Sequence, residues 1–100
     1  MTEAVDDDIP PVCASISDTI FDPAAFLNKT IVVEGRCVML DRELKRMDIS
    51  DAGAKLICRL DQVDTSDVAK LSEASVVRVT GMIKKEQRRT FILAQSVAHV

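Results

Sequence analysis

The stretch from residue 30 to residue 40, TIVVEGRCVML, constrains the fold more than any other part of the chain. It contains no proline, is rich in β-branched residues and alternates between two parities, which predicts a β-strand. It is long beside the roughly 5–6 residues of a usual strand, and a single glycine lies near its middle. A long strand with an interior glycine is typical of a bend or bulge at which one strand serves two sheets. We therefore expect the first strand of a small, closed, five-stranded barrel.

Four further strands and a helix are predicted downstream. In chain order they are a strand at 45–50, a strand at 55–60, a short helix within 61–72, a strand at 76–84 and a strand at 90–100. Thr65 or Ser66 can cap the helix. The side chains expected in the core are Met47, Ile49, Leu56, Cys58, Leu60, Val77, Val79 and Ile83, whereas Arg46, Asp48 and Ser50 are expected to face solvent. Five strands with a helix between the third and the fourth are the topology of the OB-fold, a partly open Greek-key barrel.

The first residues differ in composition from the rest of the chain. Residues 1–28 hold six of the 16 acidic residues and no Lys or Arg, so that residues 29–100 carry 13 basic against 10 acidic groups. Three consecutive aspartates and a pair of prolines oppose both helix and sheet, which predicts a flexible acidic arm over residues 1–16. Such an arm is either a solvated tail or a segment that docks on a partner or shields the basic body. The OB-fold domain is expected over residues 17–100.

A short helix is predicted immediately before the first strand. Asp22 can cap it, Pro23 suits its first position and Asn28 suits its end. Phe26 and Leu27 would then close one end of the barrel.

The residues that enzymes and metal sites need are scarce. Cys13, Cys37 and Cys58 are an odd number of thiols at intervals too wide for a zinc site, and the latter two are expected to be buried and reduced. His99 is the only histidine and stands next to Val100, so no nucleophile and base pair can be built around it. No glycine-rich phosphate loop is present, and aspartates on a flexible arm make a poor metal cage. We expect a protein that is not an enzyme and needs no metal, cofactor or small-molecule substrate.

The sequence also lacks the signals of secretion and of membrane insertion. No basic segment followed by an apolar run stands at the N-terminus, and no stretch reaches the ~18 apolar residues of a membrane span. We therefore expect an intracellular protein that has no membrane partner.

Basic residues gather where OB-folds bind single strands. That region comprises strands two and three and the loops that join strands one to two and four to five. Nine of the 13 basic residues are expected there, namely Arg42, Lys45, Arg46, Lys55, Arg59, Lys84, Lys85, Arg88 and Arg89. They would attract a nucleic-acid backbone in a salt-dependent way. Alternatively, polar loops carry such residues for solubility alone.

Aromatic residues are few, which argues against strong direct binding. Base stacking supplies about 1–3 kcal/mol per base in single-strand binders. Phe21, Phe26 and Phe91 are the only aromatic residues, and none falls on an outward position of strand two or three. Phe91, at the start of the fifth strand, is expected in the core, with exposure beside the loop as the alternative. Binding by this chain alone would therefore be electrostatic and weak.

A second set of apolar residues predicts a protein partner. In strands one, four and five this set stands opposite the inward set, and it comprises Val32, Val38, Leu40, Val76, Met82, Ile92, Ala94 and Ala98. A barrel needs one apolar parity, and an exposed apolar patch usually marks an interface. Alternatively, bulges shift the parity so that these residues also point inward.

Two motifs resemble a known family. Residues 26–38, FLNKTIVVEGRCV, are similar to the start of the barrel in the small subunit of replication protein A, and residues 77–81 resemble its fourth strand. The same outline occurs in the smallest subunit of the telomeric CST complex and in the small OB partner of the RecQ–topoisomerase complex. Those subunits usually continue past the fifth strand into a partner-binding helix, whereas this sequence stops at Val100. Either the sequence stops short of such a helix, or the barrel itself holds the partner.

The resemblance implies a nuclear accessory subunit. It would stabilise a larger OB-fold partner in a single-stranded-DNA-binding or telomere-end-protection complex, and its basic loops would assist DNA binding. The alternatives are a stand-alone single-strand binder and a protein–protein adaptor in a genome-stability complex. The sequence leaves open the partner, DNA against RNA, and replication against telomeres or repair.

Overall fold

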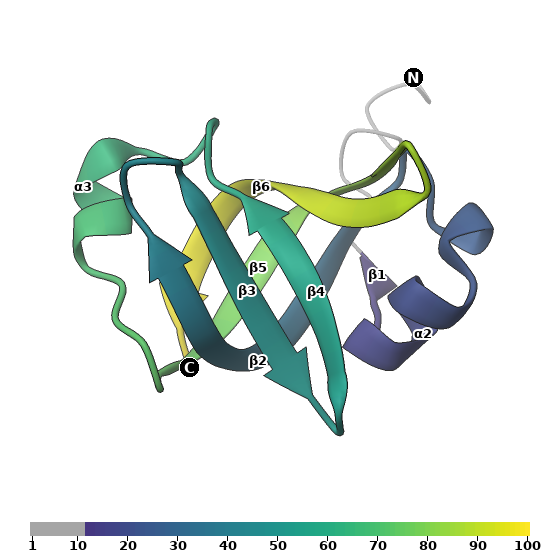
Figure 1. The fold of residues 1–100 in the computed structure, drawn as a ribbon, viewed down its shortest axis with the longest axis horizontal. Coiled ribbons are helices and arrows are strands. Elements are labelled where there is room, and N and C mark those ends of the chain that lie inside the picture. The colour runs from purple at the N-terminus through teal and green to yellow at the C-terminus, as the bar shows by residue number, and fades with distance from the viewer. Residues whose placement is uncertain (1–11) are drawn as a thin grey trace, which may run out of the picture.

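The computed structural model describes residues 12–100, in which one sheet curls into a barrel with short helices at two ends (Figure 1). The strands are β1 (Val12–Cys13), β2 (Thr30–Asp41), β3 (Arg46–Asp51), β4 (Ala54–Arg59), β5 (Val76–Glu86) and β6 (Arg89–His99). The helices are α2 (Ile16–Phe21), the 3-10 helix η1 (Pro23–Ala25) and α3 (Thr65–Ala69). Strands β2 to β6, with α3 between β4 and β5, confirm the predicted OB-fold topology.

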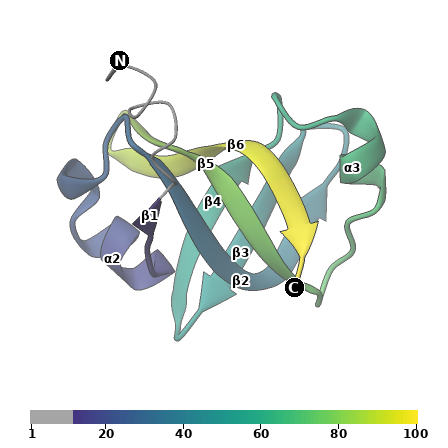
Figure 2. The same cartoon turned by 180° about the vertical axis from the view of Figure 1, so that it is seen from behind.

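β2 closes the barrel because both of its edges are paired. Residues 30–36 pair antiparallel with β5, and residues 36–41 pair antiparallel with β3. A short parallel contact between β4 and β6 joins the remaining edges (Figure 2). Gly35 lies where β2 changes partner, and a Cβ there would lie 2.7 Å from Ile16 Cδ1 and 3.0 Å from the Ser50 carbonyl oxygen. A side chain here would therefore require the end of Ile16 to move and the β3 backbone at Ser50 to shift slightly, so glycine suits the point where the barrel wall meets both α2 and β3.

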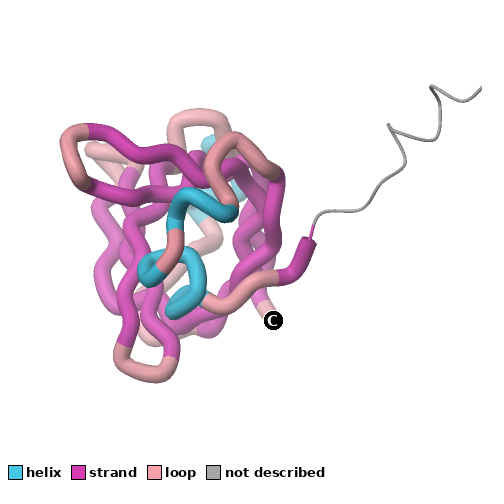
Figure 3. The backbone as a smooth tube through the Cα atoms, turned by 90° about the vertical axis from the view of Figure 1, so that its right-hand side faces the viewer, coloured by secondary structure: helices cyan, strands magenta, loops and turns pink. Residues whose placement is uncertain are grey.

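The inside of the barrel is filled by the side chains that the alternation predicts. All eight of the residues expected in the core are buried, and they lie in β3, β4 and β5 except for Leu60, which directly follows β4. Phe26 and Leu27 are half-buried and pack against this core, and α2 and η1 lie across the same end of the barrel (Figure 3). Full burial of a large aliphatic side chain contributes about 1.5–3 kcal/mol, so this set is a large part of the stabilising core.

A bulge in β2 changes which residues point inward. Cys37 pairs with a residue of β3 and so does Met39, which leaves Val38 as the extra residue between them. Beyond the bulge, Leu40 lies opposite the buried Met47 and packs against the core. Leu40, predicted on an outer partner surface, is therefore half-buried and packs partly against the core.

A second irregularity lies in the pairing of β5 with β6. The register shifts beside Gly81, which leaves Gln95 as an extra residue in β6. Gly81 lies opposite Ala94, and a Cβ on Gly81 would approach the Ala94 Cα to 2.8 Å. Ile92 and Ala94 are fully buried. Their prediction as partner-binding residues is wrong, because the bulge shifts the inward parity of β6 as the alternative interpretation requires.

The N-terminal boundary also differs from the prediction. The acidic arm was expected over residues 1–16, of which residues 1–11 lie outside the described residues. Val12 and Cys13 pair in parallel with Ile31 and Val32 of β2, and Ile16 is buried at the start of α2. Residues 12–16 therefore belong to the fold.

The helix expected before β2 is divided into two short helices. Ser15 caps α2, and its Oγ accepts the N–H of Asp18 at 3.0 Å. Pro23 opens η1 in the expected position, but the Asp22 side chain makes no capping hydrogen bond. Asn28, beyond η1, has a φ of 61° and so turns the chain into β2.

At the other end of the barrel lies α3. Its N-cap residue is Asp64 rather than Thr65 or Ser66. Val68 and Leu71 are buried, so both face the core.

Candidate nucleic-acid interface

A groove crosses the outer face of β3 and β4 between two hairpins. Its rims are the β2–β3 loop and the β5–β6 turn, and the first residues of β6 complete its floor. The residues that line it are Leu44, Arg46, Ile57, Arg59, Glu86, Gln87, Arg89 and Phe91. Three guanidinium groups and one carboxylate thus surround three apolar side chains in a hollow of about 440 Å³. This mixture suits a ligand that has both flat apolar parts and anionic groups.

The β2–β3 loop holds Leu44 at one rim. Oδ1 of Asp41 accepts the N–H groups of Glu43 and Leu44, both at 3.1 Å, which fixes a tight turn. Lys45 then has a φ of 54°, and its carbonyl oxygen accepts the N–H of Leu60 at 2.7 Å. Leu44 remains 68% exposed on this tied backbone. An exposed leucine on a fixed turn is available for contact with a ligand.

Phe91 forms the apolar centre of the groove. It lies opposite Ile57 in the parallel pairing of β4 with β6 and is half-buried. Because the neighbouring Ile92 points into the core, Phe91 must point outward. The prediction of Phe91 as a core residue is therefore wrong, and the groove contains one aromatic side chain.

Arg59 connects the aromatic ring with the charged part of the groove. Its guanidinium carbon lies 6.0 Å from the centroid of the Phe91 ring, at the outer limit of a cation–π contact. Its Nη2 also lies 3.1 Å from Oδ2 of Asp61, and the two side chains are 42% and 46% exposed. An exposed pair of this kind contributes at most about 1 kcal/mol, so an incoming anion can replace Asp61 at little cost.

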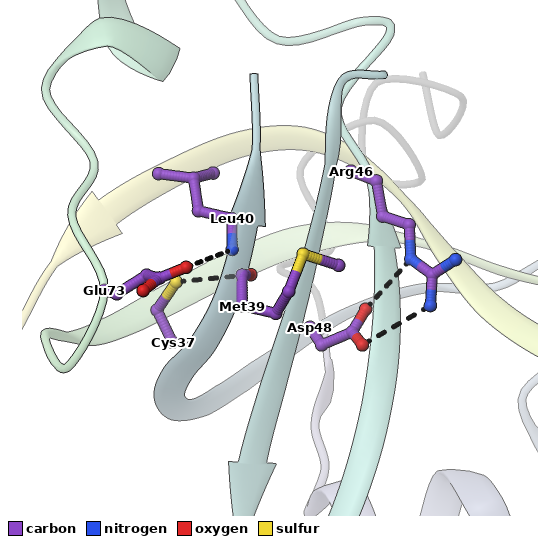
Figure 4. A network of polar contacts seen from close by, with 6 residues as sticks. All are labelled: Cys37, Met39, Leu40, Arg46, Asp48 and Glu73. Carbon is purple, nitrogen blue, oxygen red and sulfur yellow. Dashed lines mark hydrogen bonds and ion pairs between the residues drawn. The ribbon is translucent and has the colours of Figure 1, made fainter. Parts of the chain in front are cut away.

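Arg46 is anchored by a buried carboxylate. Its Nε donates to Oδ1 of Asp48 at 3.1 Å, and its Nη2 lies 3.4 Å from Oδ2 (Figure 4). Asp48 has the outward parity of β3 but is only 7% exposed, so the prediction that it faces solvent is wrong. Because a buried carboxylate is stable only when paired, Arg46 supports the groove floor as well as lining it.

The β5–β6 hairpin forms the other rim and is more regular than the predicted loop at 84–89. The strands remain paired up to Glu86 and Arg89, so only Gln87 and Arg88 form the turn. These two residues have φ values of 51° and 70°. A two-residue turn with both φ values positive favours Asn-Gly, whereas other side chains in this region cost about 1–2 kcal/mol each. Strain of this kind is typical of ligand-contacting positions.

Part of the predicted basic set comes together at this groove. Arg46, Arg59 and Arg89 line it, and Lys84 and Lys85 line an adjoining hollow that includes Phe91. Lys84 also donates to Oδ1 of Asn28 at 2.9 Å.

Other members of the basic set lie away from the groove. Arg42 donates to the carbonyl oxygen of Leu71 beside α3, and Lys45 lines the surface next to that helix. Lys55 lies next to the β3–β4 turn, at the far end of β4. Arg88 is exposed at the tip of the β5–β6 turn.

The apolar members of the groove, Leu44, Ile57 and Phe91, were not predicted as site residues from the sequence. Ile57 has the outward parity between the inward Leu56 and Cys58, so the alternation itself contained this signal. The outward parity of Phe91 was hidden by the bulge at Gln95, which no pattern in the sequence locates.

A second hollow, separate from this groove, lies along β2 beside the β3–β4 turn and the start of β5. Its lining residues are Glu34, Gly35, Arg36, Val38, Ser50, Asp51, Ala52 and Val76. Val38 and Val76 are 45% and 38% exposed. The other predicted partner residues on outward positions are Ala98, which is exposed, and Val32 and Met82, which are half-buried.

The described residues offer little to hold a metal or to act as a nucleophile. Within residues 12–100, no three His, Cys, Asp or Glu side chains gather as a ligand set. Burial raises the pKa of the Cys37 and Cys58 thiols, which disfavours the reactive thiolate. In the same residues, no helix is long and apolar enough to cross a membrane.

Comparison with known proteins identifies the fold. The sequence matches no protein-family model and no curated protein. An OBody bound to hen egg-white lysozyme has a TM-score of 0.72 at 16% identity, over 92% of this chain and 96% of that one. The hypothetical protein ygiW from E. coli gives 0.68 at 12%, over 91% of each chain. The telomere capping protein Ten1 from Saccharomyces pombe gives 0.66 at 13%, over 90% of this chain and 81% of that one. At these identities the likeness shows the OB-fold barrel alone.

Substitutions in the β5–β6 turn test whether the positive φ values of Gln87 and Arg88 lower the stability of the protein. Replacement of Gln87 by Asn and Arg88 by Gly is expected to raise the free energy of unfolding by about 1 kcal/mol, because both residues then suit positive φ. Urea denaturation with an unchanged slope measures this difference. Arg88→Gln, which removes the charge but keeps the Cβ, is the matched control and should not stabilise. If the unmodified protein, the double variant and Arg88→Gln all have the same free energy of unfolding, this turn is not strained.

Proposed function

We propose that this protein is a small OB-fold accessory subunit that binds single-stranded nucleic acid in the Phe91 groove and joins a larger OB-fold partner. The observation that carries the proposal is the placement of Arg46, Arg59 and Arg89 around one outward aromatic ring. This groove lies between the two loops that bind oligonucleotides in OB-folds.

The groove suits one stacked base and its neighbouring phosphates. A base on the Phe91 ring has Ile57 and Leu44 beside it, whereas Arg59 and Arg89 meet the backbone. Each phosphate that an arginine or lysine neutralises releases bound counterions. The binding affinity therefore falls more steeply as the salt concentration rises. Stacking on one ring contributes about 1–3 kcal/mol, which is small for a single-strand binder.

Weak binding by one groove explains the need for a partner. When two binding modules are linked, the second binding event becomes intramolecular at an effective concentration near the mM range. A larger OB-fold subunit would therefore raise the overall affinity without any new contact in this chain. The fold of the telomere capping protein Ten1 supports a role at single-stranded DNA ends, as the sequence resemblance also implies.

Phe91→Ala tests the groove directly. We expect the Kd for a fluorescent single-stranded oligothymidylate at low salt to rise about 5- to 150-fold, which corresponds to loss of one stacked base. Phe21→Ala is the matched control, because Phe21 is 92% exposed on α2 and does not line the groove. If the two variants bind the oligonucleotide equally, the groove is not the nucleic-acid site.

A second candidate function is a protein–protein adaptor without nucleic-acid binding. The observation that favours it is the hollow with the exposed Val38 and Val76, which shares no lining residue with the Phe91 groove. The OBody bound to lysozyme is a barrel of similar fold that is bound to a protein. In our leading proposal, the Val38 and Val76 hollow holds the larger subunit.

Paired charge substitutions separate the two surfaces. Val76→Asp is expected to abolish nuclease-resistant recovery of a larger OB-fold protein from cell extract, with oligonucleotide binding unchanged, because it charges an apolar contact. Leu44→Asp, at the rim of the groove, is expected to do the reverse. Mass spectrometry of the captured proteins and the oligonucleotide Kd measure the two effects. Loss of the partner with Leu44→Asp but not Val76→Asp would place the partner on the groove and favour the adaptor.

A further inference from the structure

The second half of β6 has one edge that no strand of the described chain pairs with. β6 pairs with β5 from Arg89 to His99, whereas its parallel pairing with β4 covers only Phe91 to Leu93. Within residues 12–100, no strand pairs with the other edge of β6 over residues 96–99. Figure 2 shows this end of β6 beside β5, with α3 on its other side. Backbone groups on this edge are therefore available to a further strand.

One hydrogen bond at the end of β6 fixes which backbone groups these are. The N–H of Val100 donates to the carbonyl oxygen of Val76 at 3.1 Å. In an antiparallel pair, successive residues direct their N–H and C=O groups alternately towards the partner strand and away from it. Ala98 therefore bonds to β5 as Val100 does, whereas the N–H and C=O groups of Val97 and His99 point away from β5. An added strand would bind these four groups.

This edge lacks the features that usually keep strand edges from pairing. Natural edges carry charged side chains, proline or a bulge, or are covered by a helix or loop. Residues 96–99 contain no Lys, Arg, Asp, Glu or Pro, and the bulge at Gln95 lies before them. Ser96, Ala98 and His99 are exposed, and Val97 is half-buried against the core. The edge is therefore open to pairing.

The charges beside the edge decide which kind of strand fits it. Gln95 lines a hollow of about 490 Å³ whose other walls are the loop after β4, the start of α3 and Lys45. The carboxylates that line this hollow belong to Asp61, Asp64 and Asp67, so three negative groups stand against one ammonium group. Asp61 is paired with Arg59, but Asp64 and Asp67 make no ion pair within residues 12–100. The end of the edge at Gln95 therefore favours positive charge.

We propose that an extended, basic segment of a protein partner adds to β6 as a further strand by pairing with Val97 and His99. In strand addition of this kind, main-chain hydrogen bonds give affinity and side chains give specificity. Gln95 stands two residues before Val97, about 7 Å along the strand, so a long basic side chain at that end reaches the acidic hollow. A second copy of this chain brings the same carboxylates and a nucleic acid brings phosphates, so neither supplies the complementary charge. This contact is independent of the proposed function, because it uses neither the Phe91 groove nor the second hollow.

Synthetic peptides and the full chain test the proposal at low salt. The probe is a capped heptapeptide of alternating lysine and valine. One control is the same peptide with alternate backbone nitrogens methylated, and the other is a peptide of alternating glutamate and valine. We expect only the unmethylated lysine peptide to shift the amide resonances of Val97 and His99 and to slow the hydrogen exchange of these two amides. Only this peptide offers both the main-chain hydrogen bonds and the positive charge.

Variants of the protein give an independent readout. His99→Pro removes one of the four backbone groups but no bond to β5, and strand edges tolerate proline where the N–H faces away from the sheet. We expect it to raise the Kd for the lysine peptide at least about 5-fold, because one backbone hydrogen bond is lost. His99→Ala keeps the N–H and should bind as the unmodified protein does. Asp64→Asn with Asp67→Asn should also weaken binding, whereas Glu43→Gln with Asp51→Asn, which removes the same charge away from the hollow, should not.

Equal binding of the methylated and unmethylated lysine peptides would overturn the proposal, because charge alone would then explain the contact. No binding, or shift changes centred on Phe91 instead of Val97 and His99, would also overturn it. Slow exchange of the Val97 and His99 amides without peptide would show that the edge is already covered. Protection that rises with protein concentration would then assign the edge to a second copy, and protection independent of concentration to the chain itself.

Discussion

The pairing of β2 on both edges is the constraint on which the rest of the structure depends. Its first half is hydrogen-bonded to β5 and its second half to β3, so one strand holds the two halves of the barrel together. Gly35 lies at the change of partner, where a Cβ would press on the end of Ile16 and on the Ser50 carbonyl group. With β2 fixed, the β2–β3 loop and the β5–β6 hairpin rise on either side of the same groove.

The bulges then decide which side chains are available for binding. Because β6 carries an extra residue at Gln95, Ile92 and Ala94 fill the core while Phe91 faces the groove. Because β2 carries an extra residue at Val38, Leu40 turns inward and Val38 itself stays at the surface. These two one-residue bulges thus leave Phe91 in the charged groove and Val38 in the second hollow, and the two hollows have no lining residue in common.

The strand order and most of the core follow from the sequence, because alternation in β3, β4 and β5 is regular. The apolar residues of the groove do not follow in the same way, since Phe91 belongs to a strand whose inward parity changes within its length. The positions of the basic residues in the sequence did not locate the groove. Arg42, for example, donates to the carbonyl oxygen of Leu71 beside α3, a long-range contact that local patterns do not reveal. The burial of Asp48 could not be predicted from local sequence either, because it depends on the strands that flank this residue and on Arg46.

The most direct test of the account is an NMR titration of the full chain with single-stranded oligothymidylate. If the groove is the binding site, the largest amide shift changes at low salt will fall on Ile57, Arg59 and Phe91 and on the β5–β6 turn. Val38 and Val76 will remain unperturbed. Shift changes centred on Val38 and Val76, or none at all, would contradict the assignment of the groove.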